Sequence, residues 1–124
     1  MNISLDFDGT YTEDPQHWNQ FIDSFLEAGH TVQIITMRAE HETNRSLKDL
    51  AKKIPVHFTD RKAKLPYAIE KGFHIDVWID DNPMWIYQDA KQERVDFYNE
   101  YQIYKHAAEA LGLHVKNYNE WLNS

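Results

Sequence analysis

Three times along this sequence, apolar residues at helical spacing lead to a glycine and then to a short β-branched or apolar stretch. Apolar residues at i, i+3, i+4 and i+7 form one face of an amphipathic helix, and glycine suits the left-handed residue that ends it. Strands that alternate with helices pair in parallel, and right-handed crossovers place helices on both faces of the sheet. The sequence therefore predicts an α/β fold, a three-layer α/β/α sandwich with a doubly wound parallel sheet. The three segments are residues 18–36, 65–79 and 104–115, with Gly29, Gly72 and Gly112 at their joints.

Local signals set several boundaries of the expected elements. Asp14 suits the N-cap of the first helix, Pro15 its first position, and Gly29 its left-handed end. The absence of a linker or low-complexity segment predicts a single domain over residues 1–124. The other expectations are a strand from residue 2, a helix over 39–53, a strand over 55–58, a helix end and a loop over 88–100, and a short helix over 119–122.

The composition excludes several classes of protein. The chain has 124 residues and no cysteine, which excludes disulfides, thiolate metal sites and a cysteine nucleophile. Its 20 acidic residues outnumber its 13 lysines and arginines, and the charge of −7 argues against an extended nucleic-acid interface. No apolar run approaches the roughly 18 residues that span a bilayer, and a strand from residue 2 leaves no room for a targeting peptide. We expect a cytoplasmic protein that does not bind membranes.

The first expected strand ends in two aspartates, within Asp6-Phe7-Asp8-Gly9-Thr10. Residues i and i+2 of a strand face the same way, so the carboxylates of Asp6 and Asp8 are expected to point in one direction. A cation or a shifted proton would relieve their repulsion, and Gly9 allows a sharp turn directly after them. Asp-x-Asp also occurs in ordinary turns, so the rest of the chain must decide between a site and a turn.

Polar residues follow the other expected strands as well. Thr36 ends the second strand, Lys62 and Lys64 follow the third, and Asp80 and Asp81 follow the fourth. In a doubly wound sheet, ligands bind beyond these carboxyl ends. The sequence therefore predicts one site that combines acids, a hydroxyl group and a cation.

This order of residues resembles that of the haloacid dehalogenase (HAD) superfamily of phosphohydrolases. The resemblance covers residues 3–83 and implies a phosphatase that forms a covalent aspartyl-phosphate. The residues that carry it are Asp6-Phe7-Asp8-Gly9-Thr10 for the first motif, Thr36 for the second, Lys62 or Lys64 for the third, and Asp80-Asp81 for the fourth.

The resemblance also implies a role for each acid. Asp6 would be the nucleophile, and Asp8 the general acid and base. Mg²⁺ would be held by Asp6, the backbone carbonyl of Asp8, Asp80 and, through water, Asp81. Relatives that cleave carbon–halogen bonds lack the second aspartate, so Asp8 favours a phosphate substrate.

The remaining residues would contact the phosphate. Thr36 would donate a hydrogen bond, assisted by the N-terminus of the helix expected after it. A lysine would supply fixed positive charge. We place Lys62 first, because it lies at the usual short distance after the strand, and Lys64 second. Two interpretations of Arg38 stay open, a contact to the substrate's phosphate and an exposed helix residue.

Structural explanations compete with these roles. Asn82 and Pro83 suit a helix start, where the helix dipole would favour Asp80 and Asp81. That explanation does not account for two acids at the end of an apolar strand. Thr36 is equally suited to a cap, and the joint order of the motifs is what favours the functional interpretation.

No insertion long enough for a cap domain occurs, so the site is expected to be open. An open site suits a large substrate or implies that a second subunit covers it. The expected substrate is a phosphorylated small molecule, a nucleotide or a macromolecular end, and the oligomeric state is not predicted. A receiver domain is rejected because its phosphorylated aspartate follows the third strand. A weak or inactive HAD-like module that binds phosphate or a partner remains the alternative.

Overall fold

A computed structural model describes residues 1–123 of the chain, and the side chains of residues 1–90 and 100–123. The contacts divide it into two compact units, Met1–Asp89 and Ala90–Ser124. Every candidate site residue lies in the first unit, and a single domain over residues 1–124 stays a prediction. In the described part of the chain, no helix combines the length and the apolar character needed to cross a membrane.

The first unit is an α/β arrangement around a four-stranded, all-parallel sheet of Rossmann-like type, with strand order β3-β2-β1-β4. Ile3 of the central strand β1 pairs with Val32 on one side and with Val77 on the other. The central position of β1 brings the segment that follows it next to the ends of β2 and β4. The strands are β1 Asn2–Leu5, β2 Thr31–Thr36, β3 Val56–Phe58 and β4 Val77–Ile79.

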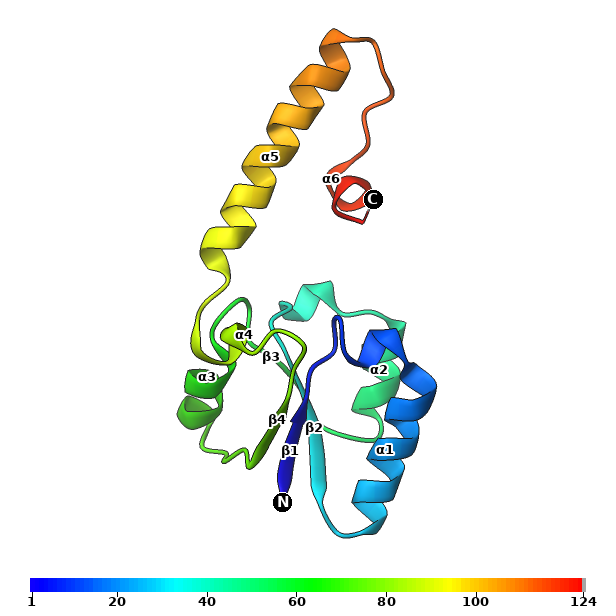
Figure 1. Cartoon of the computed structure of the whole chain (residues 1–124), viewed down its shortest axis with the longest axis vertical. Coiled ribbons are helices and arrows are strands. Elements are labelled where there is room, and N and C mark those ends of the chain that lie inside the picture. The colour runs from blue at the N-terminus through cyan, green and yellow to red at the C-terminus, as the bar shows by residue number, and fades with distance from the viewer. Residues whose placement is uncertain (124) are drawn as a thin grey trace. The chain divides into compact units, whose positions relative to one another are not determined.

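Helices connect these strands as the alternating pattern predicts. Asp14 caps α1 by accepting a hydrogen bond from the amide of His17, Pro15 begins the helix, and Gly29 follows it with φ +90°. Figure 1 shows α1 and α2 beside one face of the sheet and α3 beside the other. The helical segments of this unit are η1 Tyr11–Glu13, α1 Pro15–Glu27, η2 Glu40–Glu42, α2 Arg45–Ala51, α3 Lys64–Lys71 and α4 Met84–Tyr87.

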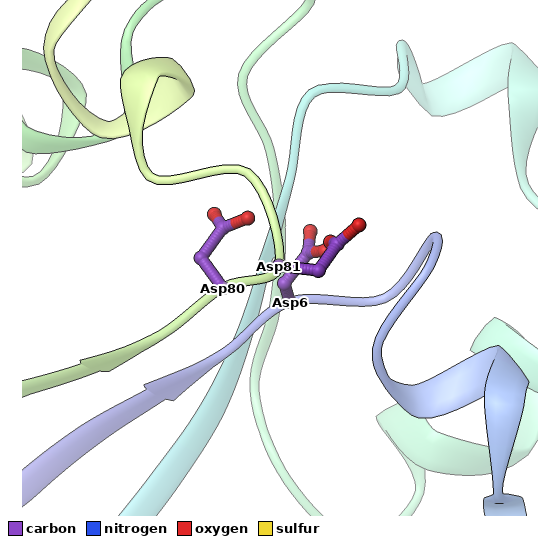
Figure 2. Close-up of side chains that lie close together, drawn as sticks. All are labelled: Asp6, Asp80 and Asp81. Carbon is purple, nitrogen blue, oxygen red and sulfur yellow. The ribbon is translucent and has the colours of Figure 1, made fainter.

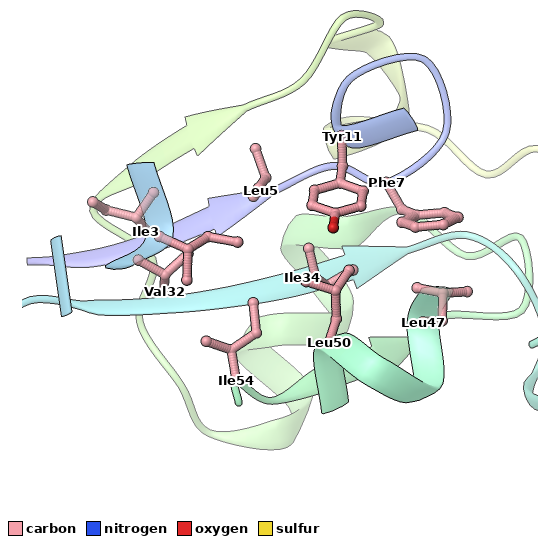
Figure 3. Packing of buried hydrophobic residues seen from close by; sticks show 10 residues of the cluster. Ile3, Leu5, Phe7, Tyr11, Val32, Ile34, Leu47, Leu50 and Ile54 are labelled. Carbon is pink, nitrogen blue, oxygen red and sulfur yellow. The ribbon is translucent and has the colours of Figure 1, made fainter. Parts of the chain in front are cut away.

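Apolar side chains from β1 and β2 form the core between the sheet and the helices α1 and α2 (Figure 3). Neighbouring residues of a strand point to opposite faces, and Ile34 and Ile35 belong to two different clusters accordingly. Ile34 packs with Leu47 and Leu50, whereas Ile35 packs with Ala68 of α3. Burial of one such side chain contributes about 1.5–3 kcal/mol.

The prediction of one helix over residues 39–53 is wrong in its first half. Glu40–Glu42 forms a short 3₁₀ turn, and α2 begins only at Arg45. The side chain of Asn44 accepts a hydrogen bond from the amide of Leu47, so the helix starts at a strong capping residue. The helix N-terminus expected directly after Thr36 is therefore absent from that position.

Two further predictions, both mainly for residues of the second unit, are wrong. Residues 88–100 were expected to form a helix end followed by a loop, but α5 begins at Lys91 and runs to Ala110. Residues 113–115 were expected to form a strand and do not; the amide of Leu113 instead donates to the carbonyl of Ala108 at 2.9 Å. The backbone of the next residue, Lys116, bonds to the hydroxyls of Tyr101 and Tyr104. The expected terminal helix is confirmed as α6, Tyr118–Leu122.

Candidate active site

Three aspartates meet at the carboxyl end of the sheet (Figure 2). Asp6 directly follows β1, and Asp80 and Asp81 directly follow β4. The amide of Asp6 donates to the carbonyl of Ile79 at 2.9 Å, which extends the pairing of the two strands up to the site. One carboxylate oxygen of each aspartate lies within 4.8 Å of the others.

Lys64 provides the positive charge inside this cluster. Its ammonium lies 2.7 Å from Asp6 Oδ1 and 2.7 Å from Asp80 Oδ2. Only 2% of Lys64 is exposed, because it is the first residue of α3 and the start of that helix faces the sheet end. Lys62 is exposed in the preceding turn. The geometry therefore favours Lys64 over Lys62, the reverse of the order that sequence spacing suggested.

Thr10 links the aspartates from the two strands. Its hydroxyl lies 3.2 Å from Asp6 Oδ2 and 3.2 Å from Asp81 Oδ1, and it accepts a hydrogen bond from the Asp81 amide. The sequence placed Thr10 in the first motif but assigned it no role. A polar residue directly after the motif glycine was the available signal.

Gly9 lets the turn after β1 approach Asp81 closely. It has φ +84°, and a Cβ built on it would lie 2.5 Å from Asp81 Oδ2. Both the left-handed backbone and the missing side chain are therefore required here.

Opposing effects act on the pKa of Asp6. Burial raises the pKa of Asp6 to about 7, the ammonium of Lys64 opposes this rise, and a hydrogen bond to the carboxyl group of Asp81 adds to it. A buried acid that shares a hydrogen bond with a second, exposed acid is a site where a bound cation relieves repulsion.

Asp8 does not join the cluster. β1 ends at Leu5, so Asp6 and Asp8 are not on one face of a strand, and the expectation that their carboxylates point together is wrong. Both oxygens of Asp8 accept from Arg38, with Nε–Oδ2 at 2.8 Å and Nη2–Oδ1 at 2.7 Å. This ion pair raises the pKa of Arg38.

Thr36 lies at the end of β2 and is 1% exposed. Its hydroxyl accepts a hydrogen bond from the amide of Arg38 at 3.3 Å. This contact closes a local turn and is not a helix cap, because no helix begins directly after Thr36. Asp80 plays a similar local role, because its Oδ1 accepts from the Asn82 amide at 3.0 Å, and α4 begins after Pro83.

The loop after β3 supports Arg38 through two residues to which the sequence assigned no role. Asp60 and Arg61 both have positive φ, 52° and 68°, although neither is glycine. Consecutive residues in this conformation are strained and mark a site where the surroundings hold the backbone. Arg61 donates to the carbonyl of Met37 from both its amide and its guanidinium.

The donor set of the acid cluster fits a hard divalent cation. Carboxylate oxygens are the ligands that Mg²⁺ and Ca²⁺ prefer, and the set does not distinguish between the two ions. Lys64 already offsets part of the charge, so a bound ion would share Asp6 and Asp80 with its ammonium.

A hollow of about 300 Å³ lies away from the acids, at the opposite end of β1 and β2. It is lined by Asn2, Thr31 and Phe73, among others, and its one charged residue, Lys53, pairs with Asp23. It offers no group for acid–base or metal chemistry.

Comparison of the chain with protein-family models, curated proteins and solved structures found no match.

Proposed function

We propose that this protein is a Mg²⁺-dependent phosphomonoester hydrolase of the HAD type, without a cap domain, that acts through an aspartyl-phosphate on Asp6. Its four-stranded sheet would be the core of a doubly wound three-layer α/β/α sandwich. We place it in the cytoplasm, with a phosphorylated small molecule, nucleotide or macromolecular end as substrate.

The observation that carries the proposal is the buried contact between Asp6 and Lys64. Asp6 lies at the end of a central strand, 2.7 Å from a lysine that also contacts Asp80. An apolar pair in this place would stabilise the fold at least as well, so stability alone does not explain the buried charges. Strongly perturbed acids with a specific charged partner are typical of catalytic sites.

Asp6, Asp8 and Lys64 each have a defined part in the reaction. An oxygen of Asp6 forms a bond to phosphorus as the bond to the leaving oxygen breaks, and Asp8 gives that oxygen a proton. Water then attacks phosphorus while Asp8 takes its proton, and the acyl-phosphate bond breaks to restore Asp6. Lys64 holds the Asp6 carboxylate in place. When bound by Asp6, Asp80, Asp81 and the carbonyl of Asp8, Mg²⁺ would offset the negative charge of nucleophile and phosphate.

One observation favours the alternative of a phosphate-binding module without turnover. Both carboxylate oxygens of Asp8 accept hydrogen bonds from Arg38, and these bonds hold the carboxylate against the guanidinium, outside the acid cluster.

Phosphate release from a panel of phosphomonoesters, with Mg²⁺ and with EDTA, separates the two functions. The hydrolase predicts release that requires Mg²⁺ and is lost in Asp6→Asn, with the circular dichroism spectrum unchanged. Binding of inorganic phosphate by calorimetry, without release from any ester, would instead support the binding module.

A further inference from the structure

Arg38 is held beside the acid cluster by several independent contacts. Its Nη1 donates to the carbonyl of Glu42 at 2.8 Å, and its guanidinium lies 5.3 Å from the centre of the Phe7 ring. Its Nε and Nη2 donate to Asp8. The guanidinium is therefore fixed in orientation before any ligand arrives.

The loop after β3 keeps this arginine in place. Arg61 Nη2 pairs with Glu42 Oε2 at 2.8 Å, and the Asp60 amide donates to the Arg38 carbonyl at 3.2 Å. The strained residues Asp60 and Arg61 thus tie the backbone on both sides of Arg38 to a second loop. Such strain is retained at sites whose geometry must be fixed.

The pair that Arg38 forms with Asp8 lies at the open side of the site. The side chain of Asp8 is 53% exposed and that of Arg38 is 28% exposed. By contrast, the side chains of Lys64 and Asp6 are 3% and 9% exposed. A ligand from solvent can therefore reach the outer pair and compete for its guanidinium.

We propose that Arg38 selects phosphomonoesters whose leaving group carries a second anionic group, such as another phosphate or a carboxylate. This inference rests on the proposed function, in which Asp8 acts on the leaving oxygen. A guanidinium bonded to Asp8 therefore stands on the leaving-group side. A phosphate or carboxylate there would accept the two parallel hydrogen bonds that Asp8 now accepts, because arginine binds both groups in bidentate fashion.

The exchange would also release Asp8. Two hydrogen bonds to Arg38 hold the Asp8 side chain in place, whereas an incoming anion would take over those donors and leave Asp8 able to turn toward the substrate. A substrate with a neutral leaving group would have to open the ion pair without this compensation.

Kinetics on matched pairs of esters test the inference. The pairs are glycerol 3-phosphate with 3-phosphoglycerate, and adenosine 5′-monophosphate with adenosine 3′,5′-bisphosphate. We expect kcat/KM of the wild type to be about 10–100-fold higher for the ester with the extra anion, which matches the usual strength of a charge-assisted hydrogen bond. The preference should nearly vanish in Arg38→Met and be intermediate in Arg38→Lys.

Both esters of a pair are measured on the same protein. A loss of folded protein therefore lowers both values of kcat/KM equally and cancels in their ratio. Arg45→Gln is the matched control, since Arg45 is an exposed arginine at the start of α2 and should leave the preference unchanged. A wild type that hydrolyses both esters equally, or a preference that survives Arg38→Met, would overturn the inference and leave the phosphatase standing. No hydrolysis of any ester would overturn both.

Discussion

Lys64 is the residue on which the acid cluster depends. It is a buried cation in contact with two carboxylates, and a third carboxylate lies close by. Removal of one member of a buried charged group leaves its partners desolvated and unpaired, which costs far more than the intact group contributes.

Lys64→Met should lower the free energy of unfolding by about 3–5 kcal/mol and abolish phosphate release. Lys62→Met is the matched comparison, because Lys62 is exposed two residues earlier, and its effect on stability should stay within about 0.5 kcal/mol. Urea unfolding and phosphate release of both variants measure this. If the Lys62 variant were the inactive one, the assignment of Lys64 would be wrong.

Asp6 predicts a pH dependence of stability. Its pKa is about 7 in the folded protein against an ordinary value of 3.8, so unfolding releases a proton between these two pH values. Stability in EDTA should therefore fall as the pH rises from about 4 to about 7. Asp6→Asn should remove this fall, and Mg²⁺ should restore stability to the wild type at about pH 8. Equal pH profiles of the urea midpoint for both proteins would contradict this.

The sequence predicted which residues belong to the site better than it predicted which of them contact one another. Asp6, Asp80 and Asp81 come together as expected because strand ends of a parallel sheet share one edge. The choice between Lys62 and Lys64 depended on where α3 starts relative to β4, which local spacing does not determine. The pairing of Asp8 with Arg38 joins residues 30 positions apart and had no local signal.

At the scale of elements, the turn after β1 brings the acids of β1 and β4 together. Its backbone is set by Gly9, which lies against Asp81, and by Thr12, whose hydroxyl accepts from the Gly9 amide at 3.0 Å. A change of shape in this turn must therefore move Asp81.

Gly9→Ala should destabilise the protein more than Gly29→Ala and weaken Mg²⁺ binding. Both glycines have positive φ, which costs an alanine about 1 kcal/mol or more, but only at Gly9 does the added Cβ meet a neighbour. Thermal unfolding with and without Mg²⁺ measures both effects. Equal losses of thermal stability in the two variants would contradict this and show that Asp81 can move away from the added Cβ at no cost.

The recurring pattern of helix, glycine and strand predicted β2 and β4 but not the end of the chain. Gly29 and Gly72 precede strands that have a neighbouring strand to pair with. Gly112 also has positive φ, but residues 113–115 after it pair with no strand of the sheet in the described part of the chain. A local pattern reports strand propensity, whereas pairing depends on a partner elsewhere in the fold.

At the scale of the whole molecule, the candidate chemistry lies in Met1–Asp89, and Ala90–Ser124 has a separate aromatic cluster. In that cluster Trp121 lies 5.6 Å from the Tyr101 ring and 6.3 Å from the Tyr104 ring. Aromatic pairs of this kind contribute about 0.5–1.5 kcal/mol each beyond the burial of their area.

Trp121→Ala should loosen the second unit without loss of phosphate release. Hydrogen exchange should become faster in α6 and in the part of α5 near Tyr101, while exchange in β1 and β4 stays as in the wild type. A large drop in Mg²⁺-dependent turnover would contradict this and show that the second unit contributes to the site.

The central claim is that Asp6 carries the phosphoryl group during turnover. The most direct measurement is acid quenching during hydrolysis of the best ester in the panel, followed by mass spectrometry of the peptides. The account predicts one added phosphoryl group on the peptide that contains Asp6, and none in Asp6→Asn or in EDTA. Steady turnover with no phosphorylated protein, or with the group on another residue, would contradict it.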